Sequence, residues 1–268
     1  MKRIIYPFLL LIFIYIIATV ANFLPNDLVL ENRSSSPSLQ HWFGTDWIGR
    51  DMLLRTLSGL QLSIKIGLFT AIGASLIGLF FAIIASTHPI MDRIVTWCID
   101  FTLSVPHILT LIFVSFLLGG GEKGVLIGLI LTHWPVITRV IRAEITQLKE
   151  MPFIHLSTKL GKSSRWIMRH HYLPHLLPQI MVSFMIVFPH SIMHEAAISF
   201  LGFGLSADRD AIGVILAESM QYLTAGYWWL ALFPGLTLLA VILIFHYVTN
   251  QLRTYLERDK SYEFNTRS

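Results

Sequence analysis

The stretch PFIHLSTKLGKSSRWIMRHHYLP, residues 152–174, is a basic, amphipathic insert between two long apolar segments. It has no Asp or Glu, and its cations are Lys159, Lys162, Arg165 and Arg169. A segment of this length and charge, inside an otherwise apolar chain, belongs in water on the side of the membrane where basic residues collect. We therefore predict a membrane-embedded chain whose insert docks a partner in the aqueous phase.

The composition of the whole chain supports a membrane protein. Of its 268 residues, 54% are hydrophobic and only 13% are charged, whereas a soluble domain has roughly a quarter charged residues. The net charge of +4 is small and the basic residues are unevenly placed, so we expect no nucleic-acid partner. A single cysteine, Cys98, excludes a disulfide framework and a multi-thiolate metal site.

Six apolar runs are long enough to cross a bilayer, which takes about 20 helical residues. They cover residues 4–24, 62–85, 94–118, 124–141, 176–201 and 228–248. They are too long and too continuously apolar for barrel strands, so helices must satisfy their backbone hydrogen bonds in lipid. The sequence predicts an all-α membrane protein with six transmembrane helices. The first run lacks a signal-peptide cleavage site, and we expect it to be retained.

Small residues mark the second run, at Gly67, Gly73 and Gly78. Small side chains let two helices approach closely, so this helix is expected inside the bundle.

The Lys and Arg residues predict the topology. If the N-terminus is cytoplasmic, most of the 20 Lys and Arg residues fall on the cytoplasmic side. Both termini are then cytoplasmic. We divide the chain into a first helix with an extracytoplasmic segment (residues 1–61), a transmembrane core (62–250) with a cytoplasmic loop at 142–175, and a cytoplasmic tail (251–268).

Two polar segments are predicted outside the cell. The first ends in HWFGTDWIGRDMLLRTLSG, residues 41–59, where aromatic and charged residues alternate. We expect this segment to form a short surface helix that leads into the second apolar run, since its charged residues have i,i+4 spacing. These residues are Asp46, Arg50, Asp51 and Arg55. The second segment, residues 206–227, is long enough for a partly helical lid or docking surface.

The first polar segment resembles the N-terminal signature of the peptide/nickel group of ABC-importer permeases. The matching positions are His41, Phe43, Gly44, Thr45, Asp46, Gly49, Arg50, Asp51, Arg55, Gly59, Ser63 and Gly67. Asp100-x-x-Leu103-x-x-Pro106 and the string SFLGFG at residues 199–204 also resemble this family. The resemblance covers nearly the whole chain and is closest to the inner permease subunits of nickel, dipeptide and oligopeptide importers.

In this family the loop that couples to the ATPase begins Glu-Ala-Ala, followed by three residues and Gly. Here His155-Leu156-Ser157 replaces the triplet, while Gly161 and Leu173-Pro174 are kept. Gly161 can supply a turn that a side chain would hinder, and we expect Pro174 to set the boundary where the loop re-enters the membrane. The resemblance implies that the coupling residues are Lys159, Leu160, Gly161, Lys162, Ser163, Arg165, Leu173 and Pro174. The alternative is that the basic residues only mark the cytoplasmic side.

The resemblance implies a type I ABC-importer permease in the bacterial cytoplasmic membrane, with no enzymatic activity and no cofactor of its own. Its partners would be a second homologous permease, two cytoplasmic ATPases that bind ATP–Mg, and an extracytoplasmic solute-binding protein. No Walker motif occurs, because the glycines at residues 119–124 lack its spacing. Energy must therefore come from another chain.

The cargo prediction depends on histidines in the apolar runs. His190 and His194 have i,i+4 spacing and could share a ligand from one helix face. With His133 and Glu195 they are candidates for the substrate path, because ionisable residues within the membrane usually face a pathway. The pair, His190 with His194, is a candidate transient metal site, which favours nickel or a metal chelate as cargo; a dipeptide or oligopeptide is the alternative. The histidines could also be ordinary packing residues.

Two other classes of protein remain. His194-Glu195 begins an HExxH-like string, but Ile198 occupies the second histidine position, which argues against a metalloprotease. A proton-coupled secondary transporter could use His and acidic residues within the membrane, but it would not explain the basic insert.

Overall fold

The computed structural model describes residues 2–24 and 32–265, with side chains for residues 5–24 and 32–256. Helices build these described residues, whose only strand-like feature is an isolated bridge between Thr45 and Asp51. Residues 25–31 of the predicted extracytoplasmic segment and residues 266–268 of the predicted tail lie outside the described residues.

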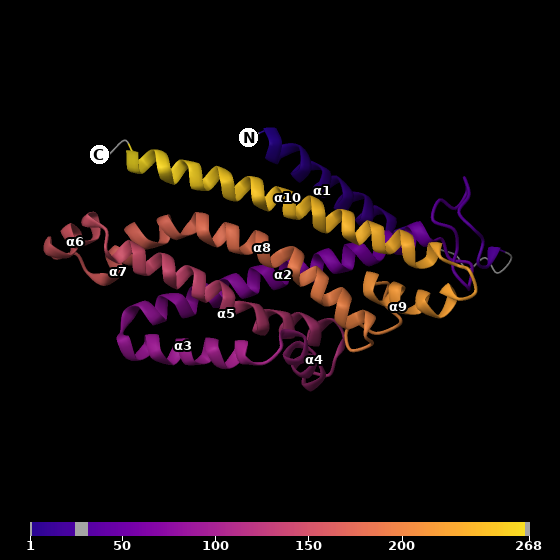
Figure 1. Cartoon of the computed structure of the whole chain (residues 1–268), viewed down its shortest axis with the longest axis horizontal. Helices are drawn as coiled ribbons and strands as arrows, with labels where there is room; N and C mark the ends of the chain where they lie inside the picture. Colours follow the sequence, from indigo (N-terminus) through magenta and orange to yellow (C-terminus); the bar gives the residue numbers. More distant parts are fainter. Residues whose placement is uncertain (1, 25–31, 266–268) are drawn as a thin grey trace.

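The helices run as follows along the chain (Figure 1). They are α1 (Lys2–Ala21), α2 (Met52–Thr87), α3 (Pro89–Ser104), α4 (His107–Leu117), α5 (Gly121–Lys149), α6 (Pro152–Lys159), α7 (Ser164–Ile167), the π-helix η2 (Met168–Tyr172), α8 (Leu173–Phe200), α9 (Ile212–Leu223) and α10 (Trp229–Asn265). The helices α2, α5 and α8 form the centre, with α1 and α10 on one side and α3 and α4 on the other. The short helices α6 and α7 lie at one end of the bundle, and α9 lies near the other.

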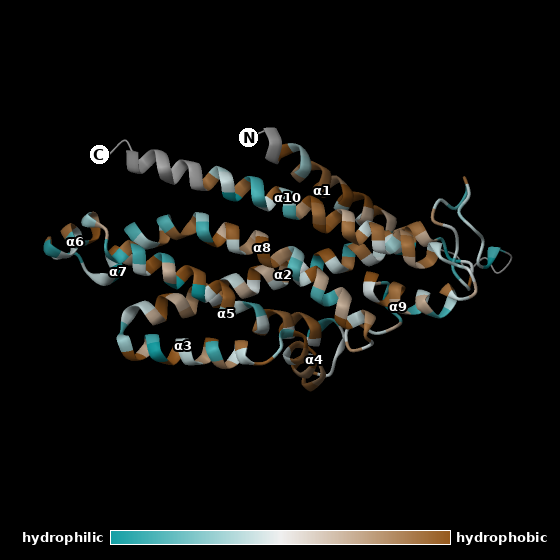
Figure 2. Cartoon of the chain, in the orientation of Figure 1, coloured by the Kyte–Doolittle hydropathy of each residue, from teal (hydrophilic) through white to brown (hydrophobic). Residues whose placement is uncertain are grey.

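Four helical stretches are long and apolar enough to cross a membrane: α2, α5, the run Ser164–Phe200, and Trp229–Leu256. The bent pair α3 and α4 makes a fifth if it counts as one span. The apolar stretch of α1, Ile5–Ala21, is shorter. Figure 2 shows hydrophobic residues along the middle of the long helices and more hydrophilic residues toward both ends of the bundle. The all-helical membrane class is confirmed, with four or five apolar spans.

The predicted continuous span over residues 94–118 is wrong. The chain breaks between α3 and α4, and the two helices differ in direction by 96°. Pro106 explains the break: it lacks an N–H, and it forces the preceding residue away from the helical conformation. Val105 accordingly has an extended backbone, with φ −95° and ψ 139°.

The surface helix predicted for residues 41–59 is wrong for the first part of that segment. Residues 40–50 form turns, and helix begins only at Met52, from which α2 continues unbroken to Thr87. Gly44 and Gly49 hold positive φ angles of +73° and +87°, which a helix does not accept.

The glycines of α2 allow the close packing that their spacing predicts. A Cβ on Gly67 would lie 2.7 Å from a side-chain carbon of Ile192 in α8, and one on Gly78 would lie 2.7 Å from Ile137 in α5. The central place of α2 in the bundle is thereby confirmed.

The contact between α8 and α9 yields a testable prediction. A Cβ on Gly213 would lie 2.2 Å from the carbonyl oxygen of Ala196 and 2.8 Å from Ser199 Cβ. A Gly213→Ala protein must separate the two helices, and we expect it to lose roughly 1–3 kcal/mol of stability. The measurement is thermal unfolding of the purified protein in detergent.

The matched control is Gly235→Ala in α10, whose new methyl group would meet only Leu216 Cδ2, at 3.8 Å. A helical Gly→Ala change without a clash stabilises by up to about 1 kcal/mol. Equal unfolding temperatures for the two variants would contradict the close α8–α9 contact.

Candidate functional site: an arginine network, a basic segment and a histidine cluster

Asp46 organises the turn that precedes α2. Its side chain is buried, and Oδ1 accepts hydrogen bonds from the backbone N–H groups of Ile48 (3.0 Å) and Arg50 (2.9 Å). Its Oδ2 accepts a hydrogen bond from Arg50 Nε at 2.7 Å. The ion pair expected from the i,i+4 spacing is therefore present, but it closes a turn instead of lying along a helix.

The end of the signature starts α2. Asp51 is the N-cap, and its carboxylate accepts hydrogen bonds from backbone N–H groups of the first turn, at 2.8 Å from Leu53. The other oxygen of Asp51 lies 2.8 Å from His41 Nδ1. Thr45 is fully buried, and its hydroxyl accepts the N–H of Ser35 at 2.9 Å. The family signature therefore encodes a specific turn and helix cap.

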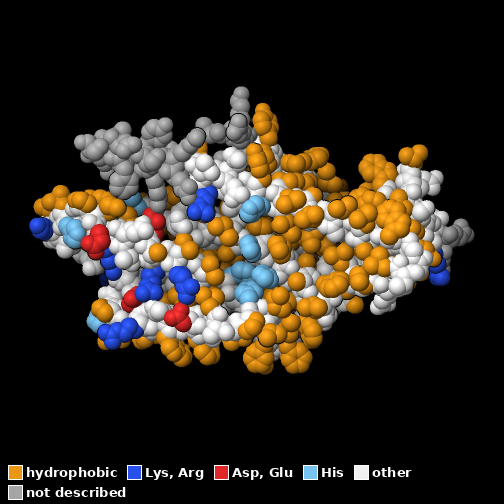
Figure 3. All heavy atoms as spheres, viewed as in Figure 1, with side chains coloured by type: hydrophobic (Ala, Val, Ile, Leu, Met, Phe, Trp, Pro, Cys, Tyr) orange, Lys and Arg blue, Asp and Glu red, His pale blue; other side chains and the backbone are white. Residues whose placement is uncertain are grey.

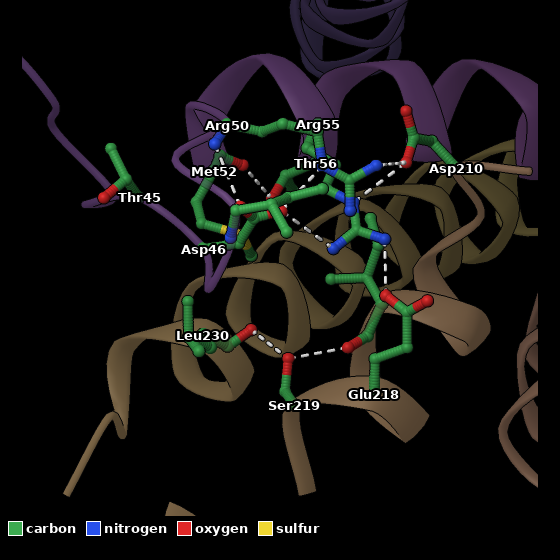
Figure 4. Close-up of polar contacts among 12 residues, drawn as sticks. Thr45, Asp46, Arg50, Met52, Arg55, Thr56, Asp210, Glu218, Ser219 and Leu230 are labelled. Carbon is green, nitrogen blue, oxygen red and sulfur yellow. Dashed lines mark hydrogen bonds and ion pairs between the residues drawn. The ribbon is translucent and has the colours of Figure 1, made fainter. Parts of the chain in front are cut away.

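Arg55 joins segments of the chain that are distant in sequence (Figure 4). Its side chain is 1% exposed; Nε donates to Asp210 at 2.9 Å, Nη1 to Asp46 at 3.4 Å, and Nη2 makes a short hydrogen bond to Glu218 of α9. We call Asp46, Arg50, Arg55, Asp210 and Glu218 the arginine network. A guanidinium suits this place because its planar fork can serve several carboxylates at once.

Aromatic stacking surrounds the arginine network. The guanidinium of Arg55 lies 5.2 Å from the ring centre of Trp47, which stacks on Tyr222 of α9 at 4.7 Å. Phe43 stacks on Phe233 of α10 at 4.6 Å. These contacts fasten residues 41–55 to α9 and to the start of α10 at one end of the bundle.

The basic segment between α5 and α8 is exposed at the opposite end. Its turn is at Gly161, which has φ +74° and open space around it. Leu156 of α6 and Leu160, which follows this helix, are 59% and 68% exposed although they are apolar. The exposed polar residues predicted for coupling are Lys159, Lys162, Ser163 and Arg165. The segment therefore offers an apolar strip flanked by cations.

The basic segment has internal order. Ser163 caps α7, where its hydroxyl accepts the N–H of Trp166 at 3.3 Å, and Lys162 Nζ lies 4.9 Å from the Trp166 ring centre. Ser157 of α6 and His171 Nε2 lie 2.9 Å apart, which links α6 to the π-helix η2.

The loop was predicted to end at Leu173 and Pro174, and this prediction is wrong. The helical run Ser164–Phe200 continues through them, so the non-helical stretch ends at Ser163. The wide turn of η2 explains this: Leu173 N–H bonds to Met168 O, and Pro174 follows where its missing N–H is tolerated.

Three histidines from three helices meet in the middle of the bundle. His107 begins α4, His133 lies in α5 and His194 in α8. The ring centre of His107 lies 4.7 Å from that of His133 and 4.3 Å from that of His194. One ring nitrogen from each lies within 4.8 Å of the other two. We call these three residues the histidine cluster.

The predicted pair of His190 and His194 is not the pair that the structure brings closest. Their ring centres are 6.4 Å apart, and His190 is exposed one turn away from the histidine cluster. His107 was not among the residues predicted from the sequence. Its position directly after Pro106, at the break of a span, is the signal that could have found it.

Glu195, which we predicted for the substrate path together with the histidines, is engaged by serines of two helices. It is fully buried, and its carboxyl accepts hydrogen bonds from Ser63 of α2 (2.6 Å) and Ser199 of α8 (2.9 Å). The structure therefore places Glu195 in the packing between α2 and α8.

Comparison with known proteins decides the family. Residues 74–262 match the family described as "Binding-protein-dependent transport system inner membrane component". The chain belongs to this family. It is therefore a multi-pass permease of the inner membrane and a transport subunit without catalytic activity, and membership implies ATPase and solute-binding-protein partners. The resemblance to ABC-importer permeases is confirmed, and the metalloprotease and secondary-transporter alternatives are excluded.

Curated relatives carry peptide-transport names. This permease is 33% identical over 227 residues to the dipeptide transport system permease protein DppC of Alkalihalophilus pseudofirmus, covering 84% of this chain and 74% of the relative. It is 32% identical over 254 residues to a putative peptide transport system permease protein of Brucella suis, covering 93% and 86%. The DppC of Bacillus subtilis is 28% identical, with 92% and 79% covered.

Solved structures share the fold of this permease. One is a chain of the MetNI methionine ABC transporter in an inward-facing conformation, with a TM-score of 0.61 and 19% identity over 76% of this chain and 97% of that one. Another belongs to an amino acid ABC transporter crystallised with histidines, with a TM-score of 0.60 and 17% identity over 76% and 94%. At these identities the similarity shows the fold alone.

Proposed function

We propose that this permease is one of two homologous permease subunits of a bacterial ABC importer that moves short peptides into the cell. The support is its similarity, over most of its length, to relatives named as dipeptide or peptide permeases. A solute-binding protein delivers the cargo outside, and two cytoplasmic ATPases bind ATP–Mg. The permease itself holds no cofactor.

The proposal includes six membrane crossings: α1, α2, the broken pair α3–α4, α5, α8 and α10. Both termini are cytoplasmic. Figure 1 supports this topology, because α10 ends toward the side that carries α6 and α7, and α1 starts facing that side. Figure 3 shows Lys and Arg side chains gathered mainly toward the same end, as expected for a cytoplasmic face. The N-terminal segment then covers residues 1–61, the transmembrane core residues 62–250 and the tail residues 251–268.

The basic segment within residues 142–175 couples the ATPases to the transmembrane helices. ATP-driven closure of the ATPases moves α6 and α7, and the continuous helix Ser164–Phe200 carries this motion to α8. The exposed leucines Leu156 and Leu160 and the cations around Gly161 support this docking role. At the other end, residues 40–58 and 206–227 face the solute-binding protein.

The cargo is tested by uptake in a strain that lacks the permease gene. We expect the wild-type gene to restore accumulation of labelled dipeptide well above the level in the empty strain. Labelled nickel and a nickel chelate are measured in parallel. Restored nickel accumulation without restored peptide uptake would overturn the peptide cargo.

A metal or metal chelate, such as nickel, is the second candidate cargo. The specific observation in its favour is the histidine cluster, since imidazole is a good ligand for nickel, copper and zinc. The same uptake experiment separates the two candidates.

A further inference from the structure

The imidazole of His107 has no hydrogen-bond partner among the described residues. Both of its ring nitrogens are buried. Buried polar atoms are nearly always paired, so this imidazole needs a partner that the described side chains do not supply, either water or a ligand. The rings of His133 and His194 lie next to His107, so a ligand shared with these two histidines would satisfy its nitrogens.

His133 is already set up as a ligand. Its Nδ1 lies 2.8 Å from the carbonyl oxygen of Leu129, which can only accept a hydrogen bond, so Nδ1 carries the proton. The proton on Nδ1 leaves the lone pair of Nε2 free. Metal-binding histidines commonly show this arrangement, in which the second nitrogen donates to a carbonyl and fixes the ring.

The chemistry of the histidine cluster selects the kind of ion. The group whose ligand atoms approach one another consists of histidines only, and the neighbouring carboxyl of Glu195 is engaged by Ser63 and Ser199. Neutral imidazoles without carboxylates suit Ni²⁺, Cu²⁺ or Zn²⁺ and do not suit Mg²⁺ or Ca²⁺, which prefer oxygen ligands. Three protein ligands also leave coordination positions open for a chelator or water.

The break between α3 and α4 brings a cavity to one member of the histidine cluster, His107. A cavity of about 320 Å³ lies there, lined among others by Leu103, Pro106, His107, Thr110 and Thr132. Figure 3 shows histidine side chains gathered near the middle of this face, apart from the Lys and Arg side chains toward the end. The exposed His190 stands one turn from His194 on the same helix.

We propose that His107, His133 and His194 bind a late first-row divalent metal ion as a three-histidine site beside the cavity at the α3–α4 break. The site lies between three helices, so its occupation depends on how α4, α5 and α8 stand relative to one another. Its role as a station for metal that travels with the cargo depends on the proposed import function, whereas metal binding itself does not.

Metal binding is tested on the purified full-length permease in nanodiscs. The probes are Ni²⁺ alone and Ni²⁺ with excess free histidine, titrated by calorimetry, and Cu²⁺ followed by electron paramagnetic resonance. We expect a single site whose Cu²⁺ spectrum shows coupling to imidazole nitrogens. His107→Gln, His133→Gln and His194→Gln should each weaken binding about tenfold or more.

The matched control is His246→Gln in α10, an exposed histidine outside the cluster, which should bind as the wild type does. Thermal unfolding checks that each variant is folded. The site is supported if the wild type binds nickel in either titration and the three cluster variants do not. Binding of Ni²⁺ alone indicates a site for the free ion, and binding only with free histidine indicates a site for the chelate. No binding in either titration, or wild-type binding by His107→Gln and His133→Gln, overturns the site.

Peptide uptake by cells with these variants keeps the two proposals apart. Lost metal binding with intact peptide uptake would support the metal site and leave the peptide-import function standing. Metal binding by the wild type without any peptide uptake would support the site and overturn only the peptide cargo.

Discussion

Replacing Arg55 by methionine should destabilise the protein more than the Gly213→Ala or histidine substitutions. The guanidinium is buried among Asp46, Asp210 and Glu218. Its removal takes away the cation that Glu218 pairs with and leaves Asp46 and Asp210 with Arg50 alone. Breaking a buried ion pair on one side costs about 3–5 kcal/mol. Asp210 and Glu218 are 35% and 24% exposed, so water can relieve part of their loss and we expect about 3 kcal/mol.

The measurement is thermal unfolding of the purified permease in detergent, with proteolysis of residues 32–55 as a second readout. Arg55→Lys should recover only some of the stability, because a single ammonium cannot replace the fork that serves three carboxylates. Arg209→Met is the control, since Arg209 is an exposed cation next to Asp210. If Arg55→Met unfolded at the same temperature as Arg209→Met, the arginine network would have no structural importance.

Gly161→Asp should abolish uptake while the protein still inserts into the membrane. Gly161 has φ +74°, and a side chain in that conformation strains the backbone by about 1–2 kcal/mol. The new carboxylate would also enter a segment whose charged neighbours are Lys159, Lys162 and Arg165. We expect the rate of peptide uptake to fall about tenfold or more, which corresponds to a barrier higher by about 1.4 kcal/mol.

Gly119→Asp provides a control matched for backbone strain. Gly119 has φ +87° and also has open space around it. It precedes the first residue of α5, at the end of this helix away from the basic segment. Uptake of labelled dipeptide is compared at equal membrane abundance, and ATP hydrolysis by the reconstituted importer is measured with its solute-binding protein. Equal uptake by the two variants would refute a coupling role for the turn at Gly161.

Much of the fold could be predicted from the sequence, because apolar runs in lipid have few alternatives to helix. The glycines of α2 likewise indicated a central helix, and Gly161 indicated a turn. The break at Pro106 was missed because hydropathy is continuous across residues 94–118, and a proline in such a run can either kink or end a helix. At Pro174 the error is the reverse: a proline was expected to mark the boundary of a helix, and the helix instead continues through it from the wide turn of η2.

The candidate site was less accessible to such reasoning. Spacing along one helix paired His190 with His194, whereas the partners of His194 come from α4 and α5 and depend on how three helices pack. Arg55 pairs with Asp210 and Glu218, which lie 155 and 163 residues further along the chain. Local spacing did find the Asp46–Arg50 pair, because four residues separate its members both in a helix and in the turn that exists.

The arginine network has a consequence for chimeric permeases. The stretch of the chain that matches the family begins at residue 74, so Asp46 and Arg55 precede it while Asp210 and Glu218 lie within it. A graft of the first 55 residues onto a subunit without acidic residues at the positions of Asp210 and Glu218 would bring Arg55 with only Asp46 of its three acceptors. Such hybrids should fold only when the acidic residues of both later positions are transplanted as well.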